Sequence, residues 1–225
     1  MKKQILKSAL IAVAGVGLLA GSVFAVPVTT TYTGDNVVNT YYLQIGDSAD
    51  DLDAGINFNN WRLADTSETF DLDAGVAYAF IWEVANFTKD GFGVNNPAAF
   101  LAQINAGSEV IYSNTTWKYA IQTIYTSNDN FNAVWNWQST TSYGTNGGAN
   151  IWTKNNSYNA IAGIGTEAQW IWSANNIFNT DYSTGDARIF IRADFTPVPE
   201  PATMLLFGTG LAGLAAVAHR RKTQA

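Results

Sequence analysis

Two segments of this chain place apolar side chains at every second position, and this period of two is typical of β-strands. Residues 188–195 set Ile189 and Ile191 on one face against Arg188 and Arg192 on the other. The side chains that share one face of residues 76–84 are Val76, Tyr78, Phe80, Trp82 and Val84. Such alternation predicts strands that bury one face in a core and turn the other toward solvent.

Further short segments favour the same kind of structure. The additional strands that the pattern predicts are residues 37–45, 109–112, 116–123 and 169–173. Turn-forming pairs such as Gly46-Asp47 and Gly147-Gly148 separate such segments. One short helix is predicted at residues 97–105, because proline suits the first turn of a helix. Many short strands without a long amphipathic helix predict an all-β sandwich for residues 26–197.

The composition excludes several chemistries. The chain has no cysteine, and its one histidine, His219, stands beside Arg220 near the C-terminus. Thiolate chemistry, a cysteine zinc site and a Ser-His-Asp relay in residues 26–197 are therefore excluded. These residues carry six basic and 17 acidic side chains, a net charge of −11 that repels the phosphates of nucleic acid. We therefore expect no nucleic-acid partner. The sequence also marks no pair of carboxylates as buried and opposed, so we expect no enzyme activity.

The first 25 residues have the features of a secretory signal peptide. Lysines near the N-terminus precede an apolar run at residues 9–20, and Ala25 stands at the expected cleavage position. The alternative is an uncleaved anchor helix, but the apolar run is short for the ~20 residues that a membrane span needs. The sequence thus predicts export of residues 26–197.

The C-terminal segment, residues 198–225, predicts a single membrane helix. The 18 residues from Pro201 to Ala218 carry no charge, and as a helix they would span about 27 Å, close to the thickness of the hydrocarbon core of a bilayer. Basic residues follow this helix and favour the cytoplasmic side of the inner membrane. The acidic body would then lie on the opposite side, in agreement with the signal peptide.

These C-terminal residues resemble the PEP-CTERM sorting tail of Gram-negative bacteria. The residues that carry the resemblance are Val198, Pro199, Glu200 and Pro201 before the apolar helix, and Arg220 and Arg221 after it. The resemblance implies that an exosortase removes the tail near Pro199 to Pro201. It also implies that the protein is anchored in the inner membrane only transiently and is then delivered to the cell surface or beyond, in an organism with an exopolysaccharide matrix.

Residues 26–197 resemble, over nearly their whole length, the galactose-binding-like jelly-roll domains. The segments that carry this resemblance are Asp35, residues 41–46, Asn60-Trp61, residues 72–75, residues 96–103, residues 116–118, residues 168–173 and residues 189–195. The resemblance implies a jelly-roll β-sandwich similar to carbohydrate-binding modules. Many of these domains bind sugars and others serve structural roles, so the fold alone does not settle the function.

Eight tryptophans point to carbohydrate binding as one use of the fold. An indole ring can stack on the C–H face of a sugar while polar side chains bind its hydroxyls. Trp82, Trp170 and Trp172 lie in predicted strands and are expected in the core. The candidate binding residues lie in turn-like or polar sequence: Trp61, Trp135, Trp137, Tyr143 and Trp152. Of these, Trp135 and Trp137 share one face if their segment is extended.

A cluster of carboxylates suggests calcium as a possible cofactor. The sequence Asp-Leu-Asp-Ala-Gly occurs at residues 51–55 and 71–75, and the candidate ligands at the first copy are Asp47, Asp50, Asp51 and Asp53. Alternating carboxylates before a glycine resemble the start of a calcium loop, but neither copy completes an EF-hand pattern. The alternative is a solvated acidic turn that leads into a strand.

The sequence therefore leaves two functions open. The first is an exported surface or matrix protein that binds polysaccharide without catalysis. The second is a structural or adhesive matrix component whose sandwich packs against its neighbours and has no defined sugar pocket.

Overall fold

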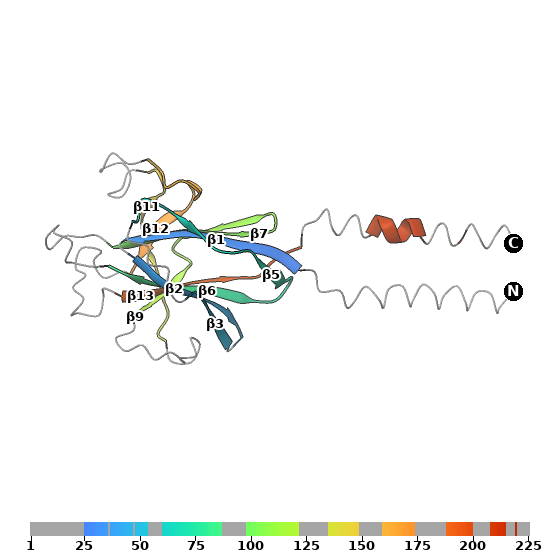
Figure 1. The fold of residues 1–225 in the computed structure, drawn as a ribbon, viewed down its shortest axis with the longest axis horizontal. Coiled ribbons are helices and arrows are strands. Elements are labelled where there is room, and N and C mark those ends of the chain that lie inside the picture. Colours follow the sequence, from blue (N-terminus) through green and yellow to red (C-terminus); the bar gives the residue numbers. More distant parts are fainter. Residues whose placement is uncertain are drawn as a thin grey trace.

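Two antiparallel β-sheets pack face to face in this computed structural model (Figure 1). The structure describes residues 25–35, 37–46, 48–53, 60–86, 98–121, 135–148, 159–173, 188–199, 208–214 and 219. The seven-stranded sheet contains β1 (Ala25–Asp35), β4 (Asp65–Thr66), β5 (Phe70–Asp73), β7 (Ala99–Ala106), β8 (Glu109–Tyr112), β11 (Thr141–Thr145) and β12 (Gln169–Trp172). The six-stranded sheet contains β2 (Val37–Ile45), β3 (Ser48–Asp53), β6 (Tyr78–Ala85), β9 (Lys118–Ile121), β10 (Gln138–Ser139) and β13 (Arg188–Phe195).

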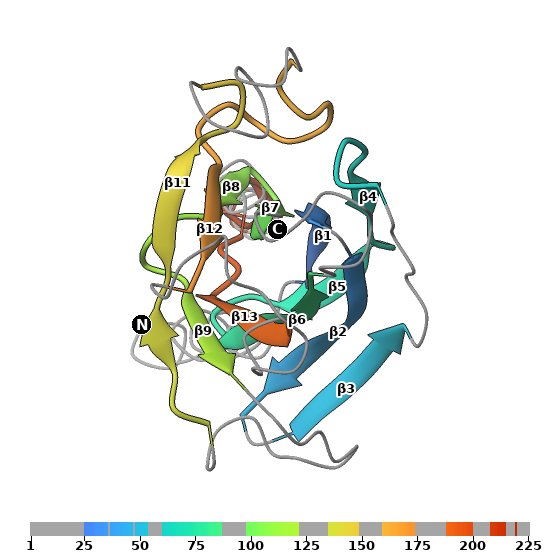
Figure 2. The same cartoon turned by 90° about the vertical axis from the view of Figure 1, so that its left-hand side faces the viewer.

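Consecutive strands repeatedly change sheet, as from β1 to β2, from β6 to β7 and from β12 to β13. The six-stranded sheet has the order β10-β9-β13-β6-β2-β3, and most of this order can be followed in the end view (Figure 2). The main path of the seven-stranded sheet is β11-β12-β7-β1-β4. The predicted all-β sandwich is therefore confirmed, and its arrangement is compatible with a jelly-roll-like domain.

Strand β6 lies at the centre of the six-stranded sheet. It pairs along its length with β13 on one side and with β2 on the other, so that Trp82 stands opposite both Ile191 and Tyr41. The inward side chains Phe80, Trp82 and Val84 belong to the main core. All eight residues of β6 are buried. The prediction that this strand buries only one face is wrong, because apolar side chains also cover its outer face.

The core is built from stacked aromatic rings around Trp82. Its ring lies parallel to that of Trp117, with centroids 5.6 Å apart and an interplanar angle of 3°. Phe100 of β7 approaches it from the opposite sheet at 5.2 Å. Phe80 stacks in turn on Phe195, at 5.2 Å and 4°. Contacts of this kind contribute about 0.5–1.5 kcal/mol per pair beyond the burial of apolar area.

Most of the predicted strands are confirmed. The bounds of β2 and β8 are the predicted ones, and β9, β12 and β13 fall within or at the predicted segments. The predicted helix at residues 97–105 is wrong, because Ala99–Ala106 form β7. β7 pairs with β1 on one side and with β12 and β8 on the other. Sheet pairing and burial there outweigh the helix propensity of an alanine-rich segment.

The strands β1 and β13 bring both ends of the sandwich domain to one place (Figure 1). Ala25, the first residue of β1, pairs with Asp73, and Phe195, the last residue of β13, pairs with Tyr78. The turn between β5 and β6 connects the start of β1 with the end of β13. Asp73, which precedes this turn, pairs with Ala25, and the Gly75 N–H donates a hydrogen bond to the Pro197 carbonyl at 2.9 Å. We call this part of the molecule the tail end.

Residues 208–214 are helical. Within the described residues, no helix is both long enough and apolar enough to cross a membrane. Most of the predicted membrane helix at residues 201–218 lies outside the described residues. The predicted signal peptide at residues 1–25 lies outside them as well, except for Ala25.

Replacing Trp82 with alanine should lower the free energy of unfolding by about 3–5 kcal/mol, because it leaves a cavity among the rings of the core. Urea unfolding followed by tryptophan fluorescence measures this loss. Leu63→Ala is the matched control: Leu63 is 58% exposed, and its truncation should change the stability by no more than about 0.5 kcal/mol. Equal effects of the two substitutions would contradict the assigned core.

Candidate functional site

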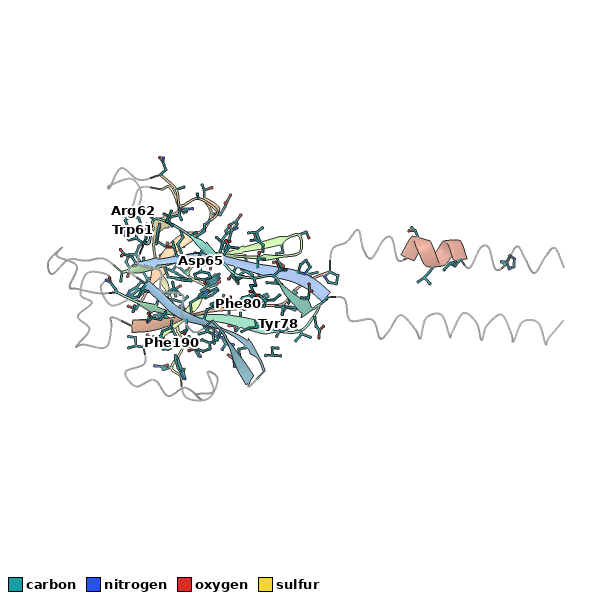
Figure 3. All side chains as sticks on the ribbon, viewed as in Figure 1. Trp61, Arg62, Asp65, Tyr78, Phe80 and Phe190 are labelled. Carbon is teal, nitrogen blue, oxygen red and sulfur yellow. The ribbon has the colours of Figure 1, made fainter. Side chains whose placement is uncertain are left out.

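The outer face of the six-stranded sheet carries a second, smaller apolar cluster. Its buried members are Tyr42, Ile81, Ala120, Trp135 and Phe190. Because side chains alternate along a strand, Phe190 points away from the main core while its neighbours Ile189 and Ile191 point into it. Figure 3 labels Phe190 on this outer side and Phe80 between the sheets. The ring of Trp135 meets Phe190 edge to face, with centroids 4.3 Å apart.

Trp137 extends this cluster toward solvent. Its ring stacks on Trp135 with centroids 5.6 Å apart and an interplanar angle of 22°. The guanidinium carbon of Arg192 lies 5.5 Å from the centroid of the Trp137 ring, within the range of a cation–π contact. Trp137 remains partly exposed. Neighbouring side chains thus hold Trp137 in place while the residue keeps part of its surface exposed.

Arg192 is fixed by a network of polar contacts. Its Nε donates to Asp194 Oδ1 at 2.7 Å, and its Nη1 donates to Gln44 Oε1 at 2.7 Å. Gln44 is only 2% exposed and donates in turn from Nε2 to the Gly46 carbonyl at 2.8 Å. On the other side of Asp194, Lys118 Nζ lies 3.5 Å from Oδ2. These contacts give Arg192 one defined orientation.

A cavity of about 330 Å³ opens beside this network. Among its lining residues are Gln44, Tyr78, Ala79, Arg192, Asp194 and Thr196. Ala79 stands opposite both Gln44 of β2 and Asp194 of β13. Its short side chain leaves room above β6 for the Arg192–Gln44 hydrogen bond and for the cavity. The volume is at the lower end of the range for small-molecule pockets, which is about 300–1,000 Å³.

This face offers a partly exposed tryptophan, a fixed guanidinium group and a carboxylate. Such a set can stack on an apolar surface and bind hydroxyl or acidic groups beside it, which is the chemistry of sugar recognition. Arg192 and Lys118 also place positive charge on a body that is acidic as a whole. The face is therefore the candidate binding site.

The structure separates the candidate tryptophans. Trp135 is only 7% exposed, so the expectation that it forms an exposed platform is wrong; its ring packs on Phe190. Trp61 lies against the main core and meets Trp170 edge to face at 6.2 Å, with Arg62 over its ring at 5.2 Å. The structure does not bring Trp61 together with the Trp135–Trp137 pair. Trp152 lies outside the described residues.

Tyr143 also lies apart from Trp137, on β11 of the other sheet. It packs against the main core, and its hydroxyl donates a hydrogen bond to the Ser173 carbonyl at 2.8 Å. Burial raises the pKa of this hydroxyl above its ordinary value, and Tyr119 raises it further. These contacts show that Tyr143 helps to hold the sandwich together. A contact between Tyr143 and a sugar stays a prediction.

The predicted calcium ligands fall partly on a strand. Asp50, Asp51 and Asp53 belong to β3, which pairs with β2 at the edge of the six-stranded sheet, and Asp47 lies outside the described residues. Within the described part of the chain, no group of three or more acidic, histidine or cysteine side chains is arranged to hold a metal. Calcium binding at this cluster stays a prediction.

The sequence did not identify the polar residues of the site, Arg192, Asp194, Gln44 and Lys118, as candidates. The alternation of residues 188–195 does place Arg192 and Asp194 on the outer face of β13, but it does not show what lies beside them. Gln44 is 148 residues away from Arg192 along the chain, so their hydrogen bond depends on strand pairing that the sequence pattern does not reveal. Lys118 joins them because β9 pairs with β13 and sets Lys118 opposite Arg192.

Comparison with known families identifies the C-terminal end of the chain. Residues 197–222 match the PEP-CTERM protein-sorting motif, which confirms the resemblance of these residues. The chain carries this motif and is therefore an exosortase-targeted protein exported to the cell envelope or surface. No curated protein and no solved structure matches the chain. The galactose-binding-like character of the sandwich stays a prediction.

The raised pKa of Tyr143 predicts a loss of stability in alkali. Above about pH 10, the unfolded tyrosine loses a proton that the folded protein retains, so the free energy of unfolding falls as the pH rises. Tyr143→Phe should make this decline shallower and should cost about 1 kcal/mol at neutral pH by removing the hydrogen bond to Ser173. Urea unfolding between pH 7 and pH 11 measures both effects. Identical slopes for the two proteins would contradict the assignment.

Proposed function

We propose that the sandwich, residues 26–197, binds polysaccharide without catalysis at the cell surface or in the extracellular matrix. The signal peptide would direct export, and the C-terminal helix would hold the protein in the inner membrane until the exosortase acts. The binding surface would be the outer face of the six-stranded sheet around Trp137 and Arg192. The processed body would then link the envelope to an exopolysaccharide.

The geometry around Trp137 is the observation that carries this proposal. The ring contacts Trp135 at 5.6 Å and Arg192 at 5.5 Å, so little side-chain entropy is lost when a ligand binds at the part of Trp137 that remains exposed. The hydrogen bonds of Arg192 to Asp194 and Gln44 likewise fix polar groups beside the ring. A rigid aromatic surface next to fixed donors and acceptors suits a sugar ring, which has an apolar face and a polar rim.

The cavity beside Arg192 gives the ligand a second point of contact. Its volume of about 330 Å³ is sufficient for a sugar unit. A polymer could stack one residue on Trp137 and place another over Ala79, with Arg192 between the two. Lys118 and Arg192 would attract a polysaccharide that carries acidic groups to this face, because the body as a whole is acidic and would repel such a polymer elsewhere.

The predicted fold adds support of a general kind. The two sheets are compatible with a jelly-roll-like domain, and the proposed galactose-binding-like family includes many sugar-binding members. This argument is an analogy between folds and does not by itself assign a function. The residues of the outer face carry the proposal.

One observation favours the second function, a structural or adhesive matrix component. Of the seven tryptophans that the structure describes, five are buried: Trp82, Trp117, Trp135, Trp170 and Trp172. Most of the indole rings therefore stabilise the sandwich. Among the described tryptophans, only Trp61 and Trp137 are partly exposed. A structural component would need no accessible ring at all.

Trp137→Ala should weaken binding to the recognised polysaccharide at least about tenfold, which corresponds to about 1.4 kcal/mol of lost stacking. The measurement is a screen of the processed body against exopolysaccharides and a glycan array, followed by titration calorimetry on any hit. Each titration is repeated with calcium and with a chelator, because the carboxylates of residues 47–53 remain candidate ligands.

Trp61→Ala is the matched control, since Trp61 also has an arginine over its ring but lies away from the cavity. It should leave the affinity unchanged. If Trp61→Ala abolished binding and Trp137→Ala did not, the binding site would lie near Trp61 and not on the outer face of the six-stranded sheet. Loss in chelator alone would assign the site to the carboxylates near β3. No binding in any condition would favour the structural function.

A further inference from the structure

The fold continues into the first residues of the sorting motif. Along β13 and beyond it, buried and exposed residues alternate: Phe195 is buried, Thr196 is exposed, Pro197 is buried and Val198 is exposed. Pro197 is also the first residue of the matched motif. The body and the motif therefore share a residue, with no linker between them.

The turn between β5 and β6 holds this residue in place. The Gly75 N–H donates to the Pro197 carbonyl at 2.9 Å, and Gly75 adopts a φ of 79°, which glycine tolerates at least cost. The base of the turn is fixed by Tyr78, whose hydroxyl accepts a hydrogen bond from the Asp73 N–H at 3.0 Å. The ring of Tyr78 stacks on Phe195 at 5.9 Å. The motif thus leaves the sandwich from a defined position.

Chain length then limits how far the motif can move from the tail end. Glu200 lies three residues beyond Pro197, and an extended chain of that length spans at most about 10 Å. A protein that grips Glu200 and Pro201 must approach the sandwich within this distance. The body is therefore close enough to take part in the recognition of the motif.

The surface that meets such a partner is mixed in character. We call it the end patch, and its residues are Ile45, Asp73, Ala77, Thr196 and Val198. All five are exposed, Ile45 at 44% and Val198 at 56%. Tyr78 stands opposite both Ile45 and Phe195, so Ile45, Ala77 and Thr196 lie beside one another. The hydrogen bond from Gly75 to Pro197 brings the turn that follows Asp73 next to the segment that contains Val198. Exposed aliphatic groups beside a carboxylate suit a protein partner, which can bury the former and pair with the latter.

We infer that the exosortase contacts the end patch together with the sorting motif. The enzyme then recognises a folded end of the protein as well as a linear sequence. The Gly75–Pro197 hydrogen bond sets the distance and orientation between the two parts of this composite surface. The consequence is that efficient processing needs the motif to remain next to the folded body.

Inserting about six Gly and Ser residues between Thr196 and Pro197 tests this inference, because it allows the motif to move up to about 20 Å from the end patch. The full chain is produced in a host with its exosortase, and loss of the tail is followed over time by mass. We expect processing to slow at least fivefold. The same host without the exosortase supplies the background.

The matched control is the same insertion between Arg62 and Leu63. Arg62 lies near the opposite end of the sandwich from Tyr78 (Figure 3), and the neighbouring Trp61 carbonyl accepts a hydrogen bond from Thr33 near the far end of β1. Processing of this variant should match that of the unmodified chain. Unchanged processing after the insertion at Pro197 would show that the motif is read alone, and faster processing would show that the body hinders the enzyme. Either result would overturn the inference.

A substitution that leaves the chain length unchanged provides a second test. Asp73→Arg reverses an exposed charge in the end patch, while Glu68→Arg makes the same change at an exposed position outside it. We expect Asp73→Arg alone to slow processing about threefold or more. The unfolding midpoint of each purified variant shows whether the fold is retained. Equal processing by the two folded variants would contradict a contact at Asp73.

Discussion

The pairing of β6 with its two neighbours is the interaction on which the rest of the structure depends. β13 and β2 flank β6, and the inward side chains of these strands meet the stacked rings around Trp82. In this register, alternation turns Gln44 and Arg192 outward while Leu43 and Ile191 face the core. Arg192 and Gln44 then lie on either side of β6, above the short side chain of Ala79. The candidate site is thus a consequence of how the core aligns three strands.

Local pattern predicted the strands well where one face is apolar and the other polar. It placed β2 and β8 at their observed bounds and identified β13 from the alternation around Ile191. It failed at β7, where an alanine-rich sequence favours a helix locally while β1, β8 and β12 supply sheet partners. It also failed to show that β6 is buried on both faces, because the covering residue Trp135 is distant in sequence. Contacts between distant segments decided both cases.

Local sequence likewise predicted one part of the candidate site and not the other. The sequence indicated Trp137, because an indole in polar, turn-like sequence suggests an accessible ring. It could not indicate which polar groups lie beside that ring, since Arg192 and Gln44 meet only through the pairing of β13, β6 and β2. It also could not separate Trp135 from Trp137: both share a face, yet Phe190 covers one ring and leaves the other partly exposed. The sorting motif was predictable because it is defined by the order of residues along the chain.

The cavity and the sorting motif are neighbours at the tail end, and this proximity connects the two proposed interactions. Thr196 lines the cavity, and Pro197 begins the motif. A polysaccharide in the cavity and an exosortase at the end patch would therefore meet near Thr196, so that the two partners would compete if both were present. Binding of the polymer would then follow removal of the tail, when the enzyme has left. Because the cavity is formed by residues that precede Pro197, a linker inserted there separates the motif from the body and leaves the sugar site in place.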